Sequence, residues 1–336
     1  MRYFITIISS VVFSCMIKSA LAQNVYEKTA KLMGVGFQFA LVSHSETEAE
    51  RHLNAAISEV KRIEALISSW NKTSQTALIN ANAGIQPIKV DDELFHLIKR
   101  SLRISKLSDG HFDISFASLD KVWYFHKPLV KIPDSTAIKN SIKHINYKHI
   151  ILDEKARTVF LKDKGMKIGF GAIGKGYAAE KVKALLKSKG VKAGLINASG
   201  DIASWGDHPK TKAWKVAITN PNTQNKDNIA WFDLHNSSVV TSGNYENYVT
   251  INNTKYTHII NPKTGWPVQD VKSVTLFANN AELCDALSTT VFVMGKNKGL
   301  ELINKLKGIE CIIIDNSDMI YQSKHLKTKQ FNNAKH

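Results

Sequence analysis

The sequence predicts an α+β or mixed α/β fold in which part of the sheet is antiparallel. Two observations predict it. Segments with apolar residues at helical spacing lie near both ends of the chain and in its middle, and six short β-like runs lie between residues 191 and 278. So many strands in succession do not fit a pure βαβ repeat. With 336 residues, 43% of them hydrophobic, the chain is long enough for one large domain.

The first half of the chain predicts two helices. One spans Ser45 to Ser68, because Ser45 and Glu48 form a capping box and apolar residues then recur at helical spacing. The other is capped by Asp91 and ends at Asp109-Gly110. The apolar stripes are Leu53, Ile57, Val60, Ile63 and Leu66 in the first helix, and Leu94, Ile98 and Leu102 in the second.

The rest of the chain predicts mostly strands. Two short strands lie around Ile150 and Val159, and a third leads into a glycine-rich segment, which a helix follows over 175–189. The later strands are predicted at Val191–Asn197, Trp214–Thr219, Ile229–Leu234, Val239–Thr241, Thr257–Asn261, Val271–Ala278 and Cys311–Ile314. Two helices, Ala281–Met294 and Lys298–Leu306, precede the last of these strands.

The amino terminus has the pattern of a secretory signal. Arg2 is followed by a mostly apolar run over 4–16 and by Ala20-Leu21-Ala22, so residues 1–22 are expected to be removed and the mature domain to span 23–336. A retained membrane anchor is the alternative, but the apolar run is short for one. A lipid on Cys15 is not expected, because residues 12–14 match a lipid-attachment box poorly. We therefore expect an exported protein, periplasmic or at the outer face of the inner membrane.

Cysteine usage and charge exclude two classes of protein. Only Cys284 and Cys311 remain after processing, which excludes a scaffold held by disulfides. The net charge is +16, but the lysines are dispersed over helix faces and a basic tail from about residue 323, which is expected to be flexible. Without a basic stripe interleaved with aromatic residues, nucleic acid is not an expected partner. An anionic substrate or surface fits the charge better.

The segment K-I-G-F-G-A-I-G-K-G-Y-A-A at 167–179 is a candidate phosphate site. Its glycines allow a ligand to approach the backbone, and the helix that follows offers free N–H groups and a positive dipole end. Lys175 adds a cation. A tight turn with no ligand is the alternative, and neither standard nucleotide-binding motif is present.

Three later segments carry polar residues in apolar surroundings. The first, N-A-S-G-D at 197–201, ends a predicted strand, so that Asp201 either faces a ligand or braces the turn. The second combines T-S-G at 241–243 with T-H-I-I-N-P-K-T-G-W-P at 257–267. Its His258 is either a catalyst or a hydrogen-bonded core group. The third is C-D-A-L-S-T at 284–289.

Asp285 and Thr289 in the third segment are candidate metal ligands. They are four residues apart, so both oxygens lie on one face of the predicted helix. The helix is strongly apolar, and a buried carboxylate needs a partner or a metal. Hard oxygen ligands suit Mg²⁺. The alternative is that Asp285 only complements the helix dipole.

Taken together and in this order, these segments resemble the ApbE family of FAD:protein FMN transferases. The resemblance runs from about Met33 to Gln322, nearly the whole mature chain. The pieces that carry it are G-A-I-G-K-G-Y-A-A (171–179), N-A-S-G-D-I (197–202), T-S-G-N-Y-E (241–246), T-H-I-I-N-P-K-T-G-W-P-V (257–268) and C-D-A-L-S-T-T-V-F-V-M-G (284–295).

The resemblance implies an ApbE-like fold, with mixed sheets flanked by helices and the FAD site between lobes. It also implies a Mg²⁺-dependent enzyme that transfers the FMN half of FAD to a threonine of an acceptor protein and releases AMP. The implied Mg²⁺ ligands are the backbone carbonyl of Ala172 and the side chains of Asp285 and Thr289. His258 matches the residue proposed in the family to assist proton transfer. The implied FAD contacts are Met33, Trp70, His111, Phe112, Asp113, Lys175 and Ile260, or its neighbour Ile259.

The chain departs from the family at two places. Gly169 stands where family members often have an Asp, which removes one polar contact to FAD, and F-D-I-S-F-A-S at 112–118 replaces the pattern F-D-P-T-V-G-P. An FAD pyrophosphatase and a periplasmic flavin-binding or delivery protein remain alternative functions. By resemblance, the acceptor is a subunit of a membrane electron-transfer complex or a secreted flavoprotein reductase.

Overall fold

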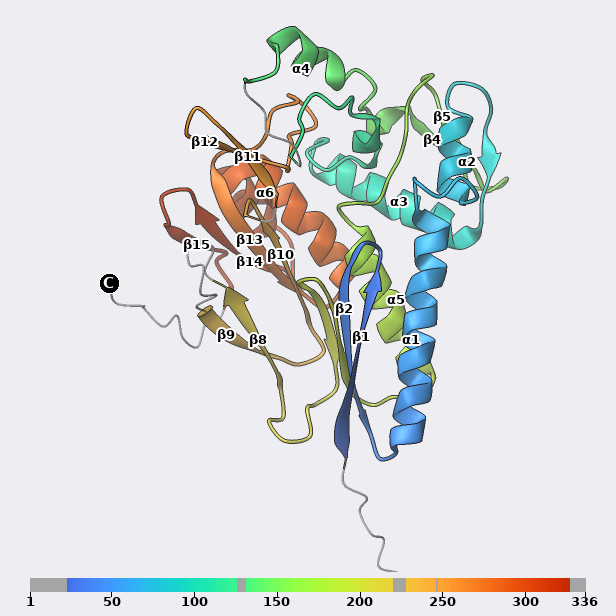
Figure 1. Ribbon diagram of the computed structural model, residues 1–336, viewed down its shortest axis with the longest axis vertical. Coiled ribbons are helices and arrows are strands. Elements are labelled where there is room, and N and C mark those ends of the chain that lie inside the picture. Colours follow the sequence, from blue (N-terminus) through green and yellow to red (C-terminus); the bar gives the residue numbers. More distant parts are fainter. Residues whose placement is uncertain (1–22, 126–130, 220–227, 246, 327–336) are drawn as a thin grey trace, which may run out of the picture.

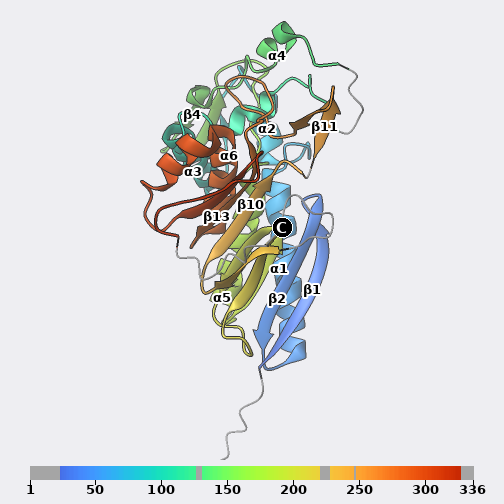
Figure 2. The ribbon, with the colours of Figure 1, turned by 90° about the vertical axis from the view of Figure 1, so that its left-hand side faces the viewer.

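An eight-stranded sheet forms the centre of the protein. The computed structural model describes residues 23–125, 131–219, 228–245 and 247–326. The strand order is β1-β2-β6-β7-β10-β13-β14-β15, and every neighbouring pair is antiparallel. Figures 1 and 2 show this sheet from two sides. The strands are β1 (Asn24–Leu32), β2 (Val35–Ser43), β6 (Gly194–Ala198), β7 (Asp201–Trp205), β10 (Ser238–Gly243), β13 (Val271–Ala278), β14 (Glu310–Asp315) and β15 (Ile320–Gln322).

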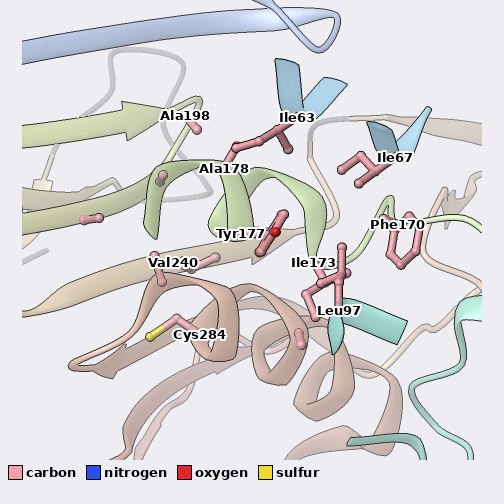
Figure 3. Close-up of a cluster of buried hydrophobic side chains, with 14 of the residues drawn as sticks. Ile63, Ile67, Leu97, Phe170, Ile173, Tyr177, Ala178, Ala198, Val240 and Cys284 are labelled. Atoms are coloured by element: carbon pink, nitrogen blue, oxygen red, sulfur yellow. The ribbon is translucent and has the colours of Figure 1, made fainter. Parts of the chain in front are cut away.

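Three long helices pack on one face of this sheet. They are α1 (Glu46–Ile67), α5 (Gly174–Ser188) and α6 (Ala281–Ile303). Helix α5 lies between the other two and contacts α1, α6, β6 and β7. Figure 3 shows the apolar side chains that gather around it, among them Ile63, Ile67, Tyr177 and Ala178. Burial of this cluster fixes the start of α5 against α6, which positions the site described below.

A β-hairpin covers part of the opposite face. It consists of β8 (Trp214–Thr219) and β9 (Asn228–Leu234), and it buries Trp214, Val216 and Leu234 against Ala40 and Val42 of β2. Strand β2 therefore has two buried faces, since Phe37, Phe39 and Leu41 point into the main core.

The remaining elements lie at one end of the molecule (Figure 1). They include the helices α2 (Gln75–Ala81), α3 (Asp92–Leu107) and α4 (Ser135–Ser141), and the 3₁₀ turns Ile114–Ser118 and Tyr147–His149. Two small sheets complete this end: β3 (Ile88–Lys89), β5 (Thr158–Leu161) and β4 (Ile150–Asp153), and the hairpin β11 (Tyr248–Ile251) with β12 (Thr254–Thr257). A separate small core around Trp123, Tyr256 and Ile260 holds the hairpin to the segment 116–125.

The predicted fold class is confirmed, and the structure makes it more specific. All strand pairs among the described residues are antiparallel, so the sheets are not mixed, and the α+β form of the prediction applies. The helices at 45–68, 91–109 and 175–189 appear within one or two residues. The predicted break between two C-terminal helices is also found: Gly295, with φ 77° and ψ 172°, interrupts α6.

Three local predictions were wrong. No strand precedes the glycine segment, because Asn80 and Ser118 bind the backbone of Ile168 and Lys167 in place of a neighbouring strand. Asp91 stands at the start of α3 but makes no capping bond; its carboxylate accepts from Gln75 of α2 instead. The strand expected at 257–261 is instead β12, which ends at Thr257, and only Ile260 forms a further bridge, to Pro267.

The predicted signal peptide and Cys15 lie outside the described residues, as does most of the basic tail. Ser323, where that tail was expected to begin, is buried, and its backbone N–H donates to Cys311. Within the described ranges, no helix combines the length and apolar character needed to cross a membrane.

Candidate active site

The site is built on the turn that precedes α5. The N–H groups of Ile173 and Gly174 both donate to the carbonyl of Phe170, which folds the chain sharply before the helix begins. The N–H of Gly176 donates across to Oδ2 of Asp285 on α6, at 2.9 Å. Within the described residues, no backbone hydrogen bond ends on the carbonyl of Ala172, four residues before Gly176. The first turn of α5 therefore lies against the Asp285 carboxylate.

Glycine is required at position 176 because α5 and α6 approach each other closely there. A Cβ at this position would lie 2.2 Å from the carbonyl oxygen of Ala281 and 2.6 Å from Cβ of Asp285. Gly171, in the preceding turn, has open space around the equivalent position. The two glycines thus serve different ends: one allows close packing, and the other leaves room above the turn.

Asp285 and Thr289 lie one helical turn apart on α6, as predicted. Asp285 is 4% exposed, whereas Thr289 is partly exposed. The Thr289 hydroxyl lies 3.5 Å from Oγ of Ser242 on β10. Oγ of Ser242 also lies 2.8 Å from Oγ of Ser288. The T-S-G segment singled out in the sequence therefore contributes Ser242 beside the proposed metal ligands.

A second buried carboxylate lies next to Asp285. Asp201, at the start of β7, is fully buried, and Nζ of Lys175 lies 3.1 Å from its Oδ1. This contact is an ion pair without hydrogen-bond geometry, because neither Asp201 oxygen accepts an aligned hydrogen bond from the residues described here. Burial, followed by the nearby charge of Asp285, raises the pKa of the Asp201 carboxyl well above its usual range.

These residues fit a divalent cation. Two buried acidic side chains, Asp201 and Asp285, lie close together, and the described residues give one ammonium beside them, that of Lys175 on Asp201. The oxygen donors around Asp285 are of the hard type that Mg²⁺ prefers. No group of three or more His, Cys, Asp or Glu side chains suited to a metal occurs in the described residues. A cation here would therefore also need the carbonyl of Ala172 and the hydroxyl of Thr289.

Two predicted flavin contacts, Met33 and Trp70, lie near this turn. Met33 Cε lies 3.5 Å from the position that a Cβ on Gly174, the first residue of α5, would occupy. Trp70 follows α1, is 84% exposed, and has Lys121 Nζ 5.7 Å from its ring centroid. Its neighbour Ser69 lies near Gly169, where a Cβ would also meet Ala117 at 3.0 Å. Trp70 is thus an exposed aromatic side chain at the rim of the glycine segment.

The predicted triplet 111–113 is held beside the same segment, since the N–H of Gly169 donates to the carbonyl of Ile114. Phe112 is 2% exposed and belongs to the core, so its ring is not open to a ligand. The Asp113 carboxylate accepts from the N–H and hydroxyl of Ser115 and from the N–H of Tyr147. Burial raises the pKa of Asp113. In this structure Asp113 braces two loops, while its role as an FAD contact stays a prediction.

His258 and Ile260 are brought to this end of the molecule by a second loop. The ammonium of Lys263 pairs with Asp109 at 2.7 Å, which joins the 257–267 segment to the loop that carries His111. Nδ1 of His258 lies 3.0 Å from the carbonyl of Asn247. Ile260 is buried in the small core, so only its backbone is available for a ligand contact.

Two contacts in the site have no signal in the sequence. Glu64 on α1 accepts from the N–H of Met33 at 3.1 Å and fixes the β1–β2 turn, where Met33 has a φ of 50°. The Asn247 carbonyl that holds His258 is a backbone group, which residue type cannot reveal. Both join residues that are far apart in the chain or act through the backbone.

The fold and the site together define an α+β protein in which a buried carboxylate, Asp285, binds the start of a helix that also carries Lys175 beside a second buried carboxylate, Asp201. Oxygen ligands and a helix start of this kind suit a divalent cation and a phosphate. Comparison with known proteins assigns the family. Residues 33–313 match the ApbE family, and the chain belongs to it.

Similar proteins cover most of the chain. An FAD:protein FMN transferase of Klebsiella pneumoniae is 31% identical over 302 residues, which are 89% of this chain and 92% of that protein. One of Treponema pallidum is 31% identical over 280 residues, 78% of this chain and 77% of that protein. The crystal structure of the ApbE protein of Thermotoga maritima superposes with a TM-score of 0.82 at 28% identity, over 90% of this chain and 97% of that one.

Proposed function

We propose that this protein transfers the FMN half of FAD to a threonine hydroxyl of an acceptor protein, in a Mg²⁺-dependent reaction that releases AMP. That the protein is an FAD:protein FMN transferase rests on homology, because it belongs to the ApbE family and is 31% identical to such a transferase over 89% of its length. The observation that supports the Mg²⁺-dependent reaction is the hydrogen bond from the start of α5 to Asp285, which joins the turn that contains Ala172 and Lys175 to the helix that carries Thr289.

In the proposed reaction, the electrophile is the FMN phosphorus of the FAD diphosphate. Ala172, Asp285 and Thr289 would hold Mg²⁺, which supplies positive charge to the phosphate oxygens and to the departing AMP. Lys175 and the N–H groups at the start of α5 would bind the same phosphates and hold them in line with the incoming hydroxyl.

The proton balance of the reaction assigns a role to His258. The threonine Oγ forms a bond to phosphorus, the bond from phosphorus to the bridging oxygen breaks, and AMP leaves with that oxygen. With Nδ1 of His258 donating to the Asn247 carbonyl, Nε2 carries the lone pair that would accept the threonine proton.

The flavin and adenine rings need apolar walls. The exposed Trp70 ring and the Met33 side chain are predicted apolar contacts near the turn, and we propose that they pack on these rings. His111, Asp113 and the backbone of Ile260 stay predicted contacts, and Phe112 would act through its backbone because its ring is buried.

We further propose that the protein works after export, without a lipid anchor, on an exported or membrane acceptor such as a subunit of an electron-transfer complex. The test is incubation with FAD, Mg²⁺ and a candidate acceptor, followed by the intact mass of the acceptor and chromatography of the flavin. FMN bound to the acceptor supports the transferase. Free FMN with AMP would indicate a pyrophosphatase, and unchanged FAD would indicate a binding or delivery protein.

The metal site is tested with variants of its two side-chain ligands. Asp285→Ala should abolish Mg²⁺-dependent transfer and leave the fold largely intact, since it removes the main anchor of the cation. Thr289→Val removes only a hydroxyl and should raise the Mg²⁺ requirement, whereas Thr289→Ser keeps that hydroxyl and should not. Normal transfer by Asp285→Ala would refute the metal assignment.

A further inference from the structure

Asp201 is a buried carboxylate that the turn around it does not explain. The turn between β6 and β7 contains Ser199 with a φ of 53° and Gly200 with a φ of 99°. It is braced by Asn197, whose Oδ1 accepts from the N–H of Gly200 at 2.8 Å. No aligned hydrogen bond from the described residues reaches the Asp201 carboxylate, although it is fully buried. A buried polar group without such a bond is costly unless it serves something nearby.

The surroundings of Asp201 indicate what it serves. Two consecutive residues at the start of α5 contact the two carboxylates separately: Lys175 pairs with Asp201 at 3.1 Å, and the N–H of Gly176 donates to Asp285 at 2.9 Å. The two carboxylates are close enough for the charge of Asp285 to act on Asp201. The Lys175 ammonium therefore lies within a small region that contains two buried acidic side chains.

We propose that Asp201 is a positioning residue of the metal site: its carboxylate holds the Lys175 ammonium away from Asp285 and leaves that carboxylate open for the cation. The proposal rests on the proposed function in taking Asp285 as a metal ligand. Without Asp201, the nearby Lys175 ammonium would pair with Asp285, because opposite charges attract strongly where water is largely excluded. A metal ion would then have to displace the ammonium.

This role differs from direct coordination, and the two make opposite predictions for a double variant. If Asp201 acts through Lys175, removing both side chains removes the competitor together with the residue that restrained it. The remaining Asp285 should then bind the cation as it does in the wild type. If Asp201 instead binds the metal itself, the loss caused by its replacement should persist when Lys175 is removed as well.

The test is a titration of the FAD-free full-length protein with Mn²⁺, a spectroscopic substitute for Mg²⁺, in which electron paramagnetic resonance measures the unbound ion. Asp201→Asn should weaken Mn²⁺ binding by about tenfold or more, the range seen for residues that support a metal ligand. Lys175→Met should not weaken it. The double variant should return to within about threefold of Lys175→Met, as expected for strongly coupled neighbours.

Asp315→Asn is the matched control, because Asp315 is also a buried carboxylate paired with a lysine, Lys296 at 2.9 Å, but on β14. It should leave Mn²⁺ affinity unchanged. Should Asp201→Asn fail to fold, the comparison of the double variant with Lys175→Met decides alone. Unchanged affinity in Asp201→Asn, or a double variant as weak as that single one, would overturn the proposal.

The same titration separates this inference from the proposed function. Normal Mn²⁺ binding with the expected pattern of variants would support the role of Asp201 even if no acceptor were modified. If the wild-type protein and Asp285→Ala gave the same titration, no ion would bind at Asp285. That result would overturn both the proposed function and the role of Asp201.

Discussion

The backbone N–H of Gly176 donates to Oδ2 of Asp285 over 2.9 Å, and this bond joins the first turn of α5 to α6. In a regular helix that N–H would reach back toward the carbonyl of Ala172. Here it binds Asp285 instead, and no backbone N–H of the described residues binds the Ala172 carbonyl. One hydrogen bond thus ties the helix that follows Ala172, one proposed metal ligand, to a second proposed ligand, Asp285.

The first prediction concerns the close approach on which this bond depends. Gly176→Ala would place a methyl group 2.2 Å from the Ala281 carbonyl, so α5 and α6 must separate. We expect a loss of about 2 kcal/mol in the free energy of unfolding, typical of overpacking in a core, together with a loss of FMN transfer. Urea denaturation and the transfer assay would measure the two effects.

Gly171→Ala is the control for the stability measurement. It changes the same turn, but a Cβ there has no neighbour within 4 Å, so its free energy of unfolding should stay within about 0.5 kcal/mol of wild type. Equal destabilisation by both substitutions would show that the turn needs glycine for its backbone and not for the helix contact.

Local patterns predicted α1, α3, α5 and α6, but not the short helices α2 and α4. The α1 stripe and the Ser45 cap depend only on residues within a few positions, and the Ser45 side chain does accept from the N–H of Glu48. The spacing of Asp285 and Thr289 likewise follows from helix geometry. Such features are encoded locally, so the sequence reveals them.

Features that depend on distant partners were missed or left open. The β1–β2 hairpin escaped prediction because β1 carries charged residues along its exposed face and only alternate positions are covered. The burial of Phe112 and the bracing role of Asp113 depend on elements elsewhere in the chain, such as Tyr147. The role of Asp201 could not be decided until Lys175 was seen beside it. Contacts of this kind are set by topology, which residue spacing alone does not determine.

The second prediction concerns His258. With Nδ1 directed at the Asn247 carbonyl, the ring presents Nε2 as a base, and its removal should affect the chemical step. His258→Ala should lower the single-turnover rate of FMN transfer by about 100-fold or more and change the FAD dissociation constant by less than about threefold. FAD fluorescence and quenched-flow assays would measure the two quantities.

His149→Ala is a suitable control. His149 also has a polar partner, Asp163, but it belongs to the 3₁₀ turn before β4 and not to the 257–267 segment. It should change neither quantity. If His258→Ala weakened FAD binding as much as it slowed transfer, His258 would be a binding residue and the proton would have to go elsewhere.

The third prediction concerns acid stability and the carboxylate of Glu93 on α3. It accepts hydrogen bonds from Arg62 of α1 at 2.8 Å and from the Tyr177 hydroxyl of α5 at 2.5 Å, and Lys181 lies 3.1 Å away. Burial acts to raise the pKa of Glu93, but these three partners outweigh it and lower that pKa to about 2. The ionised form therefore links three helices.

Because the folded-state pKa lies below the ordinary value of 4.5, the unfolded chain takes up this proton first as the pH falls. The stability that Glu93 contributes is complete above pH 4.5 and is lost progressively between about pH 4.5 and 2. Glu93→Gln should lower the free energy of unfolding at pH 7 by about 1–2 kcal/mol, an amount reduced by the solvent exposure of the cluster.

Urea denaturation at several pH values would test this, with the difference between wild type and Glu93→Gln as the measured quantity. That difference should be constant from pH 7 to 5 and shrink below pH 4.5, because protonation abolishes what the substitution already removed. Glu301→Gln is the control, since the exposed Glu301 of α6 pairs, among the described residues, with the exposed Lys305 just after that helix. Its effect should be small at every pH. A Glu93→Gln difference that stayed constant down to pH 3 would mean that the charge of Glu93 does not hold the three helices together.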